Sequence, residues 1–233
     1  MSRTYLIIGA QSIIAKHVIE GLLKEEHHVL AASRKPHEIA PANRLKTLFF
    51  DADPSESTLD LPDSLDGLVY FPGSITLKPI TRLTEEDFLR DYRVNVLGAV
   101  RVIQQALPSL KKSPRASIVL FSSVAAQVGM GFHSSIATAK AGVEGLGRSL
   151  AAELAPKVRV NMIAPSLTDT PLAASLLSNE EQRRLAADRH PSKSIGAPED
   201  VAALVTFLLS DRSQFMTGQV LRLDGGLSSV KLF

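Results

Sequence analysis

The amino-acid sequence predicts an α/β fold with a doubly wound, mostly parallel sheet of seven strands and helices on both faces. Seven short runs rich in β-forming apolar residues alternate with longer segments whose apolar residues recur at helical spacing. Most of the short runs are continuously apolar, which is typical of parallel strands buried on both faces. No linker, low-complexity tract or internal repeat interrupts the 233 residues, so we expect residues 1–233 to form one domain.

Each element has its own signal. The expected strands are, in order, Tyr5–Ile8, His28–Ala32, Thr47–Phe50, Gly67–Phe71, Ala116–Ser122, Arg159–Ile163 and Val220–Leu223. Long helices are predicted over residues 84–107 and 134–155, and a shorter one begins at Pro198, followed by two acids in its first turn. Ligands of a doubly wound sheet bind beyond the carboxyl ends of its strands, so the residues that follow each strand are the candidates for a site.

Composition excludes several classes of protein. The net charge is +2 with both signs interspersed, which argues against a nucleic-acid partner. No Cys is present, so disulfides, thiolate metal sites and a cysteine nucleophile are excluded, and we predict no metal. No apolar run approaches the roughly 18 residues that a membrane span needs. The first apolar run is too short for a signal peptide, so we expect a cytoplasmic protein without a membrane partner.

The turn after the first strand is a candidate phosphate site. Gly9 leads through a short turn into an amphipathic helix, whose free N–H groups and dipole would face an anion. The alternative is an ordinary strand–turn–helix connection, because only one glycine is present. The candidate contacts are Gly9, Gln11, Ser12, Ile13 and Ile14.

The second strand ends in Ser33 and Arg34. An acid at this position would bind the ribose 2′-hydroxyl of NAD, whereas a hydroxyl and a guanidinium suit a 2′-phosphate. These two residues therefore favour NADP(H), with a solvated loop arginine as the alternative.

A series of motifs in the second half of the chain has a specific order and spacing. The motifs are Asn95–Gly98, Ser122-Ser123, Ala139–Gly142, Val160–Pro165, Gly196–Val201, Thr217–Gln219 and Asp224–Gly226. This series resembles the short-chain dehydrogenase/reductase family, particularly its 3-oxoacyl-acyl-carrier-protein reductase-like branch, over almost the whole chain. The resemblance implies a Rossmann-type domain that transfers hydride between NADP(H) and a small-molecule carbonyl or alcohol. It also implies a homotetramer or homodimer that packs through the two long helices.

The resemblance assigns a role to each matching residue. Asn95 matches the asparagine that holds a proton-relay water, Ser123 the serine that orients the substrate oxygen, and Lys140 the lysine that contacts the nicotinamide ribose. Pro165 and Thr170 match the loop that holds the carboxamide. The remaining cofactor contacts that it implies are Asp51, Ala52 and Gly73. From the residues alone, Lys140 lies in an apolar helical stripe, where it either reaches solvent or serves a site.

The chain departs from the family pattern at its proton donor. The family tyrosine lies four residues before the lysine, and this chain has Ile136 there. Ile13 and Ala15 replace the second and third glycines of the family's glycine motif. His133 lies seven residues before Lys140, two helical turns away, and is our predicted replacement donor. The alternatives are that His133 is an exposed loop residue or that Ser135, a weaker acid, donates the proton.

Three hypotheses follow. The first is an NADP(H)-dependent oxidoreductase with an altered proton donor, which the retained Asn95, Ser123 and Lys140 favour. The second is a catalytically silent NADP(H)-binding sensor or scaffold, which Ile136 favours. The third is a fold that no longer binds a dinucleotide. Ile136 and Ile13 both favour the second and the third hypotheses.

Overall fold

The computed structural model describes residues 2–53 and 57–231, and within them seven parallel strands form one sheet in the order β3-β2-β1-β4-β5-β6-β7. The strands are β1 (Thr4–Ile8), β2 (His28–Ser33), β3 (Leu45–Phe49), β4 (Gly67–Tyr70), β5 (Ala116–Phe121), β6 (Val158–Pro165) and β7 (Val220–Leu223). β1 pairs with both β2 and β4, so the strand order reverses at β1. The predicted fold class is confirmed, and the reversal marks the edge at which ligands of such sheets bind.

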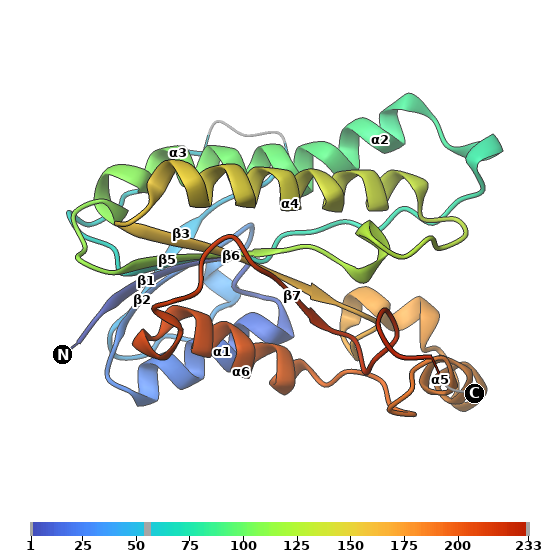
Figure 1. Ribbon diagram of the computed structural model, residues 1–233. Coiled ribbons are helices and arrows are strands. Elements are labelled where there is room, and N and C mark those ends of the chain that lie inside the picture. The colour runs from blue at the N-terminus through green and yellow to red at the C-terminus, as the bar shows by residue number, and fades with distance from the viewer. Residues whose placement is uncertain (1, 54–56, 232–233) are drawn as a thin grey trace.

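Helices cover both faces of the sheet (Figure 1). They are α1 (Ile13–Lys24), α2 (Glu85–Tyr92), α3 (Gly98–Leu110), α4 (Ser134–Leu154), α5 (Glu180–Asp188) and α6 (Pro198–Leu209). Successive side chains of a strand point to opposite faces. Leu6 and Ile8 of β1 therefore pack in the core with α3 and α4, whereas Tyr5 and Ile7 pack in the core with α1 and α6.

The predicted helix over residues 84–107 is interrupted. A capping box between Thr84 and Asp87 starts α2, which ends at Tyr92, and a π-helical turn (η3, Arg93–Leu97) precedes α3. The buried Tyr70 hydroxyl donates to the Val94 carbonyl in this π turn at 2.6 Å. This π turn was not predicted from the sequence.

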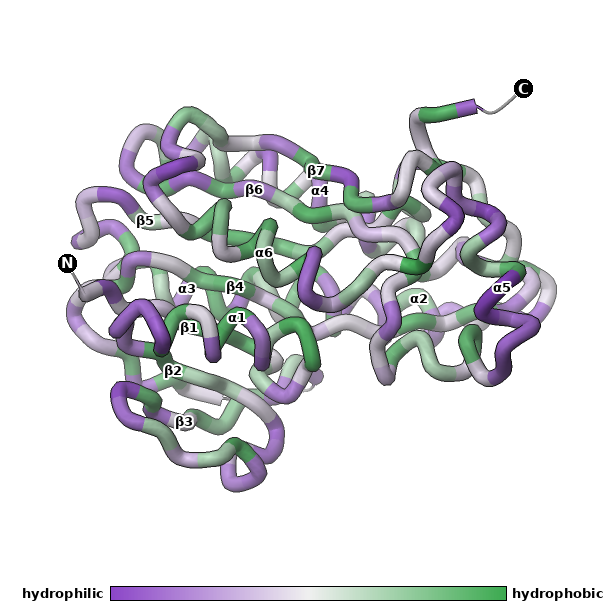
Figure 2. The backbone as a smooth tube through the Cα atoms, turned by 90° about the horizontal axis from the view of Figure 1, so that it is seen from below, coloured by the Kyte–Doolittle hydropathy of each residue, from purple (hydrophilic) through white to green (hydrophobic). Residues whose placement is uncertain are grey.

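Between β3 and β4, residues 50–53 and 57–66 contain no helix. β3 is an edge strand and is mostly exposed, unlike the buried central strands. The α5 segment is largely hydrophilic and lies beyond the ends of the strands (Figure 2). Within residues 2–53 and 57–231, no helix is long and apolar enough to cross a membrane.

Candidate active site

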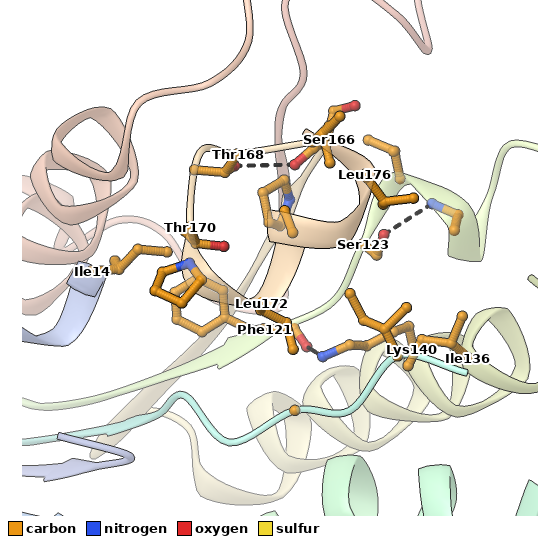
Figure 3. Close-up of a pocket in the computed structure, with 18 of the residues that line it drawn as sticks. Ile14, Phe121, Ser123, Ile136, Lys140, Ser166, Thr168, Thr170, Leu172 and Leu176 are labelled. Atoms are coloured by element: carbon orange, nitrogen blue, oxygen red, sulfur yellow. Dashed lines mark hydrogen bonds between the residues drawn. The ribbon is translucent and has the colours of Figure 1, made fainter. Parts of the chain in front are cut away.

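A cleft of about 710 Å³ opens at the carboxyl ends of the strands (Figure 3). The turn after β1 and the loops after β4, β5 and β6 form its walls, together with α4 and residues of α5. Most of the lining is apolar, and a few polar groups reach it. Of the residues predicted from sequence, the cleft brings together Gly9, Gln11, Ser12, Ile13, Ile14, Gly73, Ser123, His133, Lys140, Pro165 and Thr170.

The turn after β1 has the geometry of an anion site. Gly9 has a positive φ of 80°, and a Cβ there would lie 3.0 Å from Cδ of Pro72, so only glycine fits this close turn. α1 begins at Ile13, and its Ser12 cap makes no side-chain hydrogen bond. The first intrahelical bond runs from Lys16 N–H to the Ser12 carbonyl, so the N–H groups of residues 13–15 remain available at the helix end. Ser12 and Ile13 line the cleft at this helix terminus, where free N–H groups suit a diphosphate.

Lys140 brings a buried ammonium to the cleft. Its Nζ atom donates a 2.9 Å hydrogen bond to the Phe121 carbonyl at the end of β5 (Figure 3). Burial lowers the pKa of Lys140 from 10.5 to about 8, against the opposing effect of the Asp91 charge. Ile136 lies one helical turn earlier on α4 and also lines the cleft.

Ser123 contributes a hydroxyl at the end of β5. Its Oγ accepts a hydrogen bond from Ala125 N–H at 3.2 Å. This contact holds the oxygen in place and leaves the hydroxyl proton to donate toward the cleft, because no acceptor for it occurs among residues 2–53 and 57–231.

Asn95 lies beside Lys140 and below the cleft surface. Its Nδ2 donates to Ser74 Oγ at 3.1 Å and to the Asp91 carbonyl at 2.8 Å, whereas its buried Oδ1 has no partner. A Cβ on Gly73 would lie 3.3 Å from this Oδ1 and 3.6 Å from Nζ of Lys140. The glycine therefore leaves space beside an orphaned acceptor and an ammonium. A ribose hydroxyl or a water molecule could bond both Oδ1 of Asn95, an acceptor, and Nζ of Lys140, a donor.

Asp91 was not predicted from sequence, and it organises the polar groups below the cleft. The carboxylate is fully buried, and Ser74 and Thr76 donate to Oδ1 at 2.6 and 3.2 Å. Ser135 donates to Oδ2 at 2.7 Å. Ser135 is thus a buried partner of Asp91 that does not line the cleft. Helical periodicity cannot foresee such a contact, since 44 residues separate the two.

The remaining predicted contacts lie outside the cleft, beyond β2 and β3. Arg34 is exposed and makes no hydrogen bond or ion pair with the described residues. Ser33 is buried, and its Oγ accepts from Lys35 N–H at 3.2 Å. Asp51 accepts from Asp53 N–H at 3.2 Å, and the buried Ala52 accepts from Arg101 through its carbonyl. An elongated ligand that follows the strand ends from β5 past β1 to β2 would meet this second group.

His133 lines the cleft at the start of α4 and is partly exposed. Its Nδ1 lies 2.7 Å from the carbonyl of Gly131, in its own loop. A histidine absent from the sequence predictions also reaches the cleft: His190, next to Ser166. In the described residues, no cluster of three His, Asp or Glu side chains has the arrangement of a metal site.

The family model described as enoyl-(acyl carrier protein) reductase matches residues 55–228. The chain belongs to the short-chain dehydrogenase/reductase family. A tropinone reductase homolog of Arabidopsis thaliana is 40% identical over 165 residues, which are 70% of this chain and 63% of that protein, so the match spans less than two thirds of the relative.

Longer matches support this assignment to the short-chain dehydrogenase/reductase family. The 3-oxoacyl-[acyl-carrier-protein] reductase MabA of Mycobacterium tuberculosis is 29% identical over 97% of this chain and 93% of that protein. The solved structure of ElxO with NADP bound superposes with a TM-score of 0.85, at 26% identity, over 99% of this chain and 100% of that one.

Proposed function

We propose that the protein transfers hydride between NADP(H) and a carbonyl or alcohol substrate, with a proton donor other than the family tyrosine. One observation carries this proposal: the buried Lys140 ammonium and the Ser123 hydroxyl line the same cleft as the Gly9 turn and the start of α1. A chain that had lost all chemistry has no physical need for a buried ammonium with a pKa lowered to about 8.

The cofactor supplies hydride at its nicotinamide when bound, and the chain supplies the contacts. The N–H groups at the start of α1 suit the diphosphate. Arg34, exposed at the end of β2, suits the 2′-phosphate that distinguishes NADP(H) from NAD(H). The family relative ElxO was solved with NADP bound, which supports a nicotinamide cofactor in this cleft.

The residues of the chain then act on the substrate oxygen. Ser123 donates a hydrogen bond from its hydroxyl to the carbonyl oxygen and orients it. The ammonium of Lys140, in a largely apolar cleft, stabilises negative charge as it develops on that oxygen. Ile136 provides an apolar wall and has no proton to give, so another cleft group completes the alcohol. His133 is the donor predicted from sequence.

A silent NADP(H)-binding sensor or scaffold is the second candidate function. Ile136 favours it, because this side chain removes the hydroxyl group expected one turn before Lys140. The two functions share the cofactor and differ only in turnover.

An oligomer built on α2 and α4 accompanies this proposal. Leu89, Tyr92 and Leu97 expose 39, 42 and 37% of their surfaces along α2 and the π turn, an unusual apolar display for a solvated helix. We propose that a second copy covers them, in a homodimer or homotetramer of 25.1 kDa protomers. Sedimentation at the mass of one protomer would contradict this.

Titration with NADPH tests the proposal first, since the chain has no Trp to obscure the cofactor fluorescence. NADPH oxidation is then measured with a panel of apolar ketones, aldehydes and diketones. We expect saturable binding and turnover, with turnover lost in Lys140→Met and kept in Lys24→Met, a surface substitution of the same kind on α1. Binding without turnover would favour the sensor, and the absence of binding would exclude both functions.

A further inference from the structure

Ser166 and His190 form a hydrogen-bonded pair on the wall of the cleft. Ser166 Oγ lies 2.8 Å from Nε2 of His190, and both residues line the cleft. Ser166 directly follows Pro165, at the carboxyl end of β6. Its backbone is held on both sides, because its N–H donates to the Leu223 carbonyl at 3.1 Å and its carbonyl accepts from Thr168 Oγ1 at 3.1 Å (Figure 3). The hydroxyl therefore has a defined position in the cleft.

The second nitrogen of His190 fixes the ring. Nδ1 lies 2.9 Å from the Ala186 carbonyl, and a carbonyl only accepts, so Nδ1 carries a proton. The ring is 4% exposed and cannot turn to solvent without losing both bonds. In the neutral ring Nε2 accepts the hydroxyl proton of Ser166. In the imidazolium Nε2 donates to Ser166 Oγ, and the hydroxyl proton becomes available to another acceptor.

We propose that Ser166, backed by His190, donates the proton that completes the alcohol in this enzyme. Resting on the function proposed above, the step begins as hydride reaches the carbonyl carbon and the C–O π pair moves to oxygen. The Ser166 O–H bond breaks and its proton joins that oxygen. Ser166 Oγ then takes the Nε2 proton of the imidazolium, which leaves neutral His190. After product release, Ser166 takes a proton from water in the cleft and passes its own to Nε2, which restores the imidazolium. Oxidation of an alcohol runs through the same bonds in reverse.

The geometry favours this pair over the other proton carriers of the cleft. His133 is partly exposed, and its Nδ1 is bound to the carbonyl of its own loop. Ser135 lies below the cleft and donates to Asp91. Ser166 combines a hydroxyl in the cleft with a buried imidazole ring directly behind it, an arrangement that suits general acid–base catalysis.

Three variants separate a proton relay from a structural tie. His190→Gln keeps a group that can hydrogen-bond Ser166 and removes the titrating ring, so we expect NADPH affinity and substrate KM within about twofold of wild type. A general acid contributes about 10²–10⁴-fold, so kcat should fall by about 100-fold or more. Ser166→Ala should show the same loss, whereas Ser166→Thr, which keeps a hydroxyl, should recover most of it. His28→Gln, at the exposed amino end of β2, is the matched control.

The experiment uses NADPH with the carbonyl of the panel that is reduced fastest. Unchanged kcat in His190→Gln, with the wild type active, would show that the pair is only a structural tie and would leave the proposed function standing. A loss in His133→Gln but not in His190→Gln would transfer the donor role to His133. A wild type without any turnover would overturn the proposed function and the relay together.

A second measurement needs neither cofactor nor turnover. In the free protein, nitrogen-15 NMR of the histidine rings reports which nitrogen of His190 carries the proton. We expect the neutral ring to be protonated at Nδ1, with an Nε2 shift that changes in Ser166→Ala. A neutral ring protonated at Nε2, or a ring signal insensitive to Ser166→Ala, would contradict the relay.

Discussion

The hydroxyl of Ser135 donates a 2.7 Å hydrogen bond to Oδ2 of Asp91, deep between α2 and α4. Ser74 and Thr76 complete the shell of this fully buried carboxylate from the loop after β4. Hydroxyl donors stabilise the charge without neutralising it. The retained negative charge then acts on Lys140, whose pKa it raises against the larger effect of burial.

Replacement of Asp91 by Asn should therefore lower the pKa of Lys140 further below about 8. The amide keeps the size of the carboxyl group and removes its charge, so the ammonium loses its favourable Coulomb interaction. The pKa is measured by NMR of the lysine side chain. Glu86→Gln, which removes an exposed charge from the same helix, is the control and should leave the titration of Lys140 unchanged. An equal titration in wild type and Asp91→Asn would contradict the electrostatic link.

The stability of the protein should rise with pH through the range in which Lys140 titrates. Its pKa is about 8 in the folded chain, against 10.5 as the ordinary value, so the unfolded chain binds more protons between these two pH values. Stability increases with pH wherever the unfolded state binds more protons. The cost of burying the charged form is complete below pH 8 and disappears above pH 10.5, a difference of about 3 kcal/mol at 1.36 kcal/mol per pKa unit.

Urea unfolding of wild type and Lys140→Met measures this effect. The difference in unfolding free energy between the two should move by about 3 kcal/mol in favour of wild type from neutral to strongly alkaline pH. Lys24→Met, on the surface of α1, controls for the loss of a lysine. A difference that is constant with pH would show that Lys140 does not titrate below its ordinary range.

Arg34 should determine the preference for NADPH over NADH. Loss of a charge-assisted bond to a phosphate costs at least about 1.4 kcal/mol, so Arg34→Ala should weaken NADPH binding by about tenfold or more. NADH affinity should stay within about twofold. Fluorescence titration of both cofactors gives the four constants, and Arg44→Ala, an arginine paired with Glu26, is the control. Equal affinities of the wild type for NADPH and NADH would contradict the role assigned to Arg34.

The pattern of apolar runs was enough to predict the strands, because burial on both faces leaves a direct trace in composition. All seven predicted strands exist, and none of their ends differs from the prediction by more than two residues. The predicted residues Gly9, Ser123 and Lys140 all line the cleft. Gly9 and Ser123 follow strands, and Lys140 lies on α4 and bonds the end of β5. The Asp91–Ser135 contact and the Ser166–His190 pair were not predicted from the sequence. Each joins residues 24 or more positions apart through side-chain geometry that no periodicity encodes.

Ile136 offers the sharpest test of how this protein completes its reaction. The side chain is 4% exposed and lies on the cleft one helical turn before Lys140. Tyr at this position would bring a hydroxyl near the ammonium, at an overpacking cost of about 1–3 kcal/mol. If the cleft holds cofactor and carbonyl in the family manner, Ile136→Tyr should add a second donor and raise kcat.

Ile136→Phe is the matched control, because it adds the same ring without the hydroxyl. A gain in Ile136→Tyr that is absent in Ile136→Phe would assign the effect to the proton, and it should persist in the double variant Ile136→Tyr with His190→Gln. A silent wild type with turnover only in Ile136→Tyr would instead show that no altered donor operates. The natural protein would then be a cofactor-binding sensor, because a single hydroxyl would separate it from an enzyme.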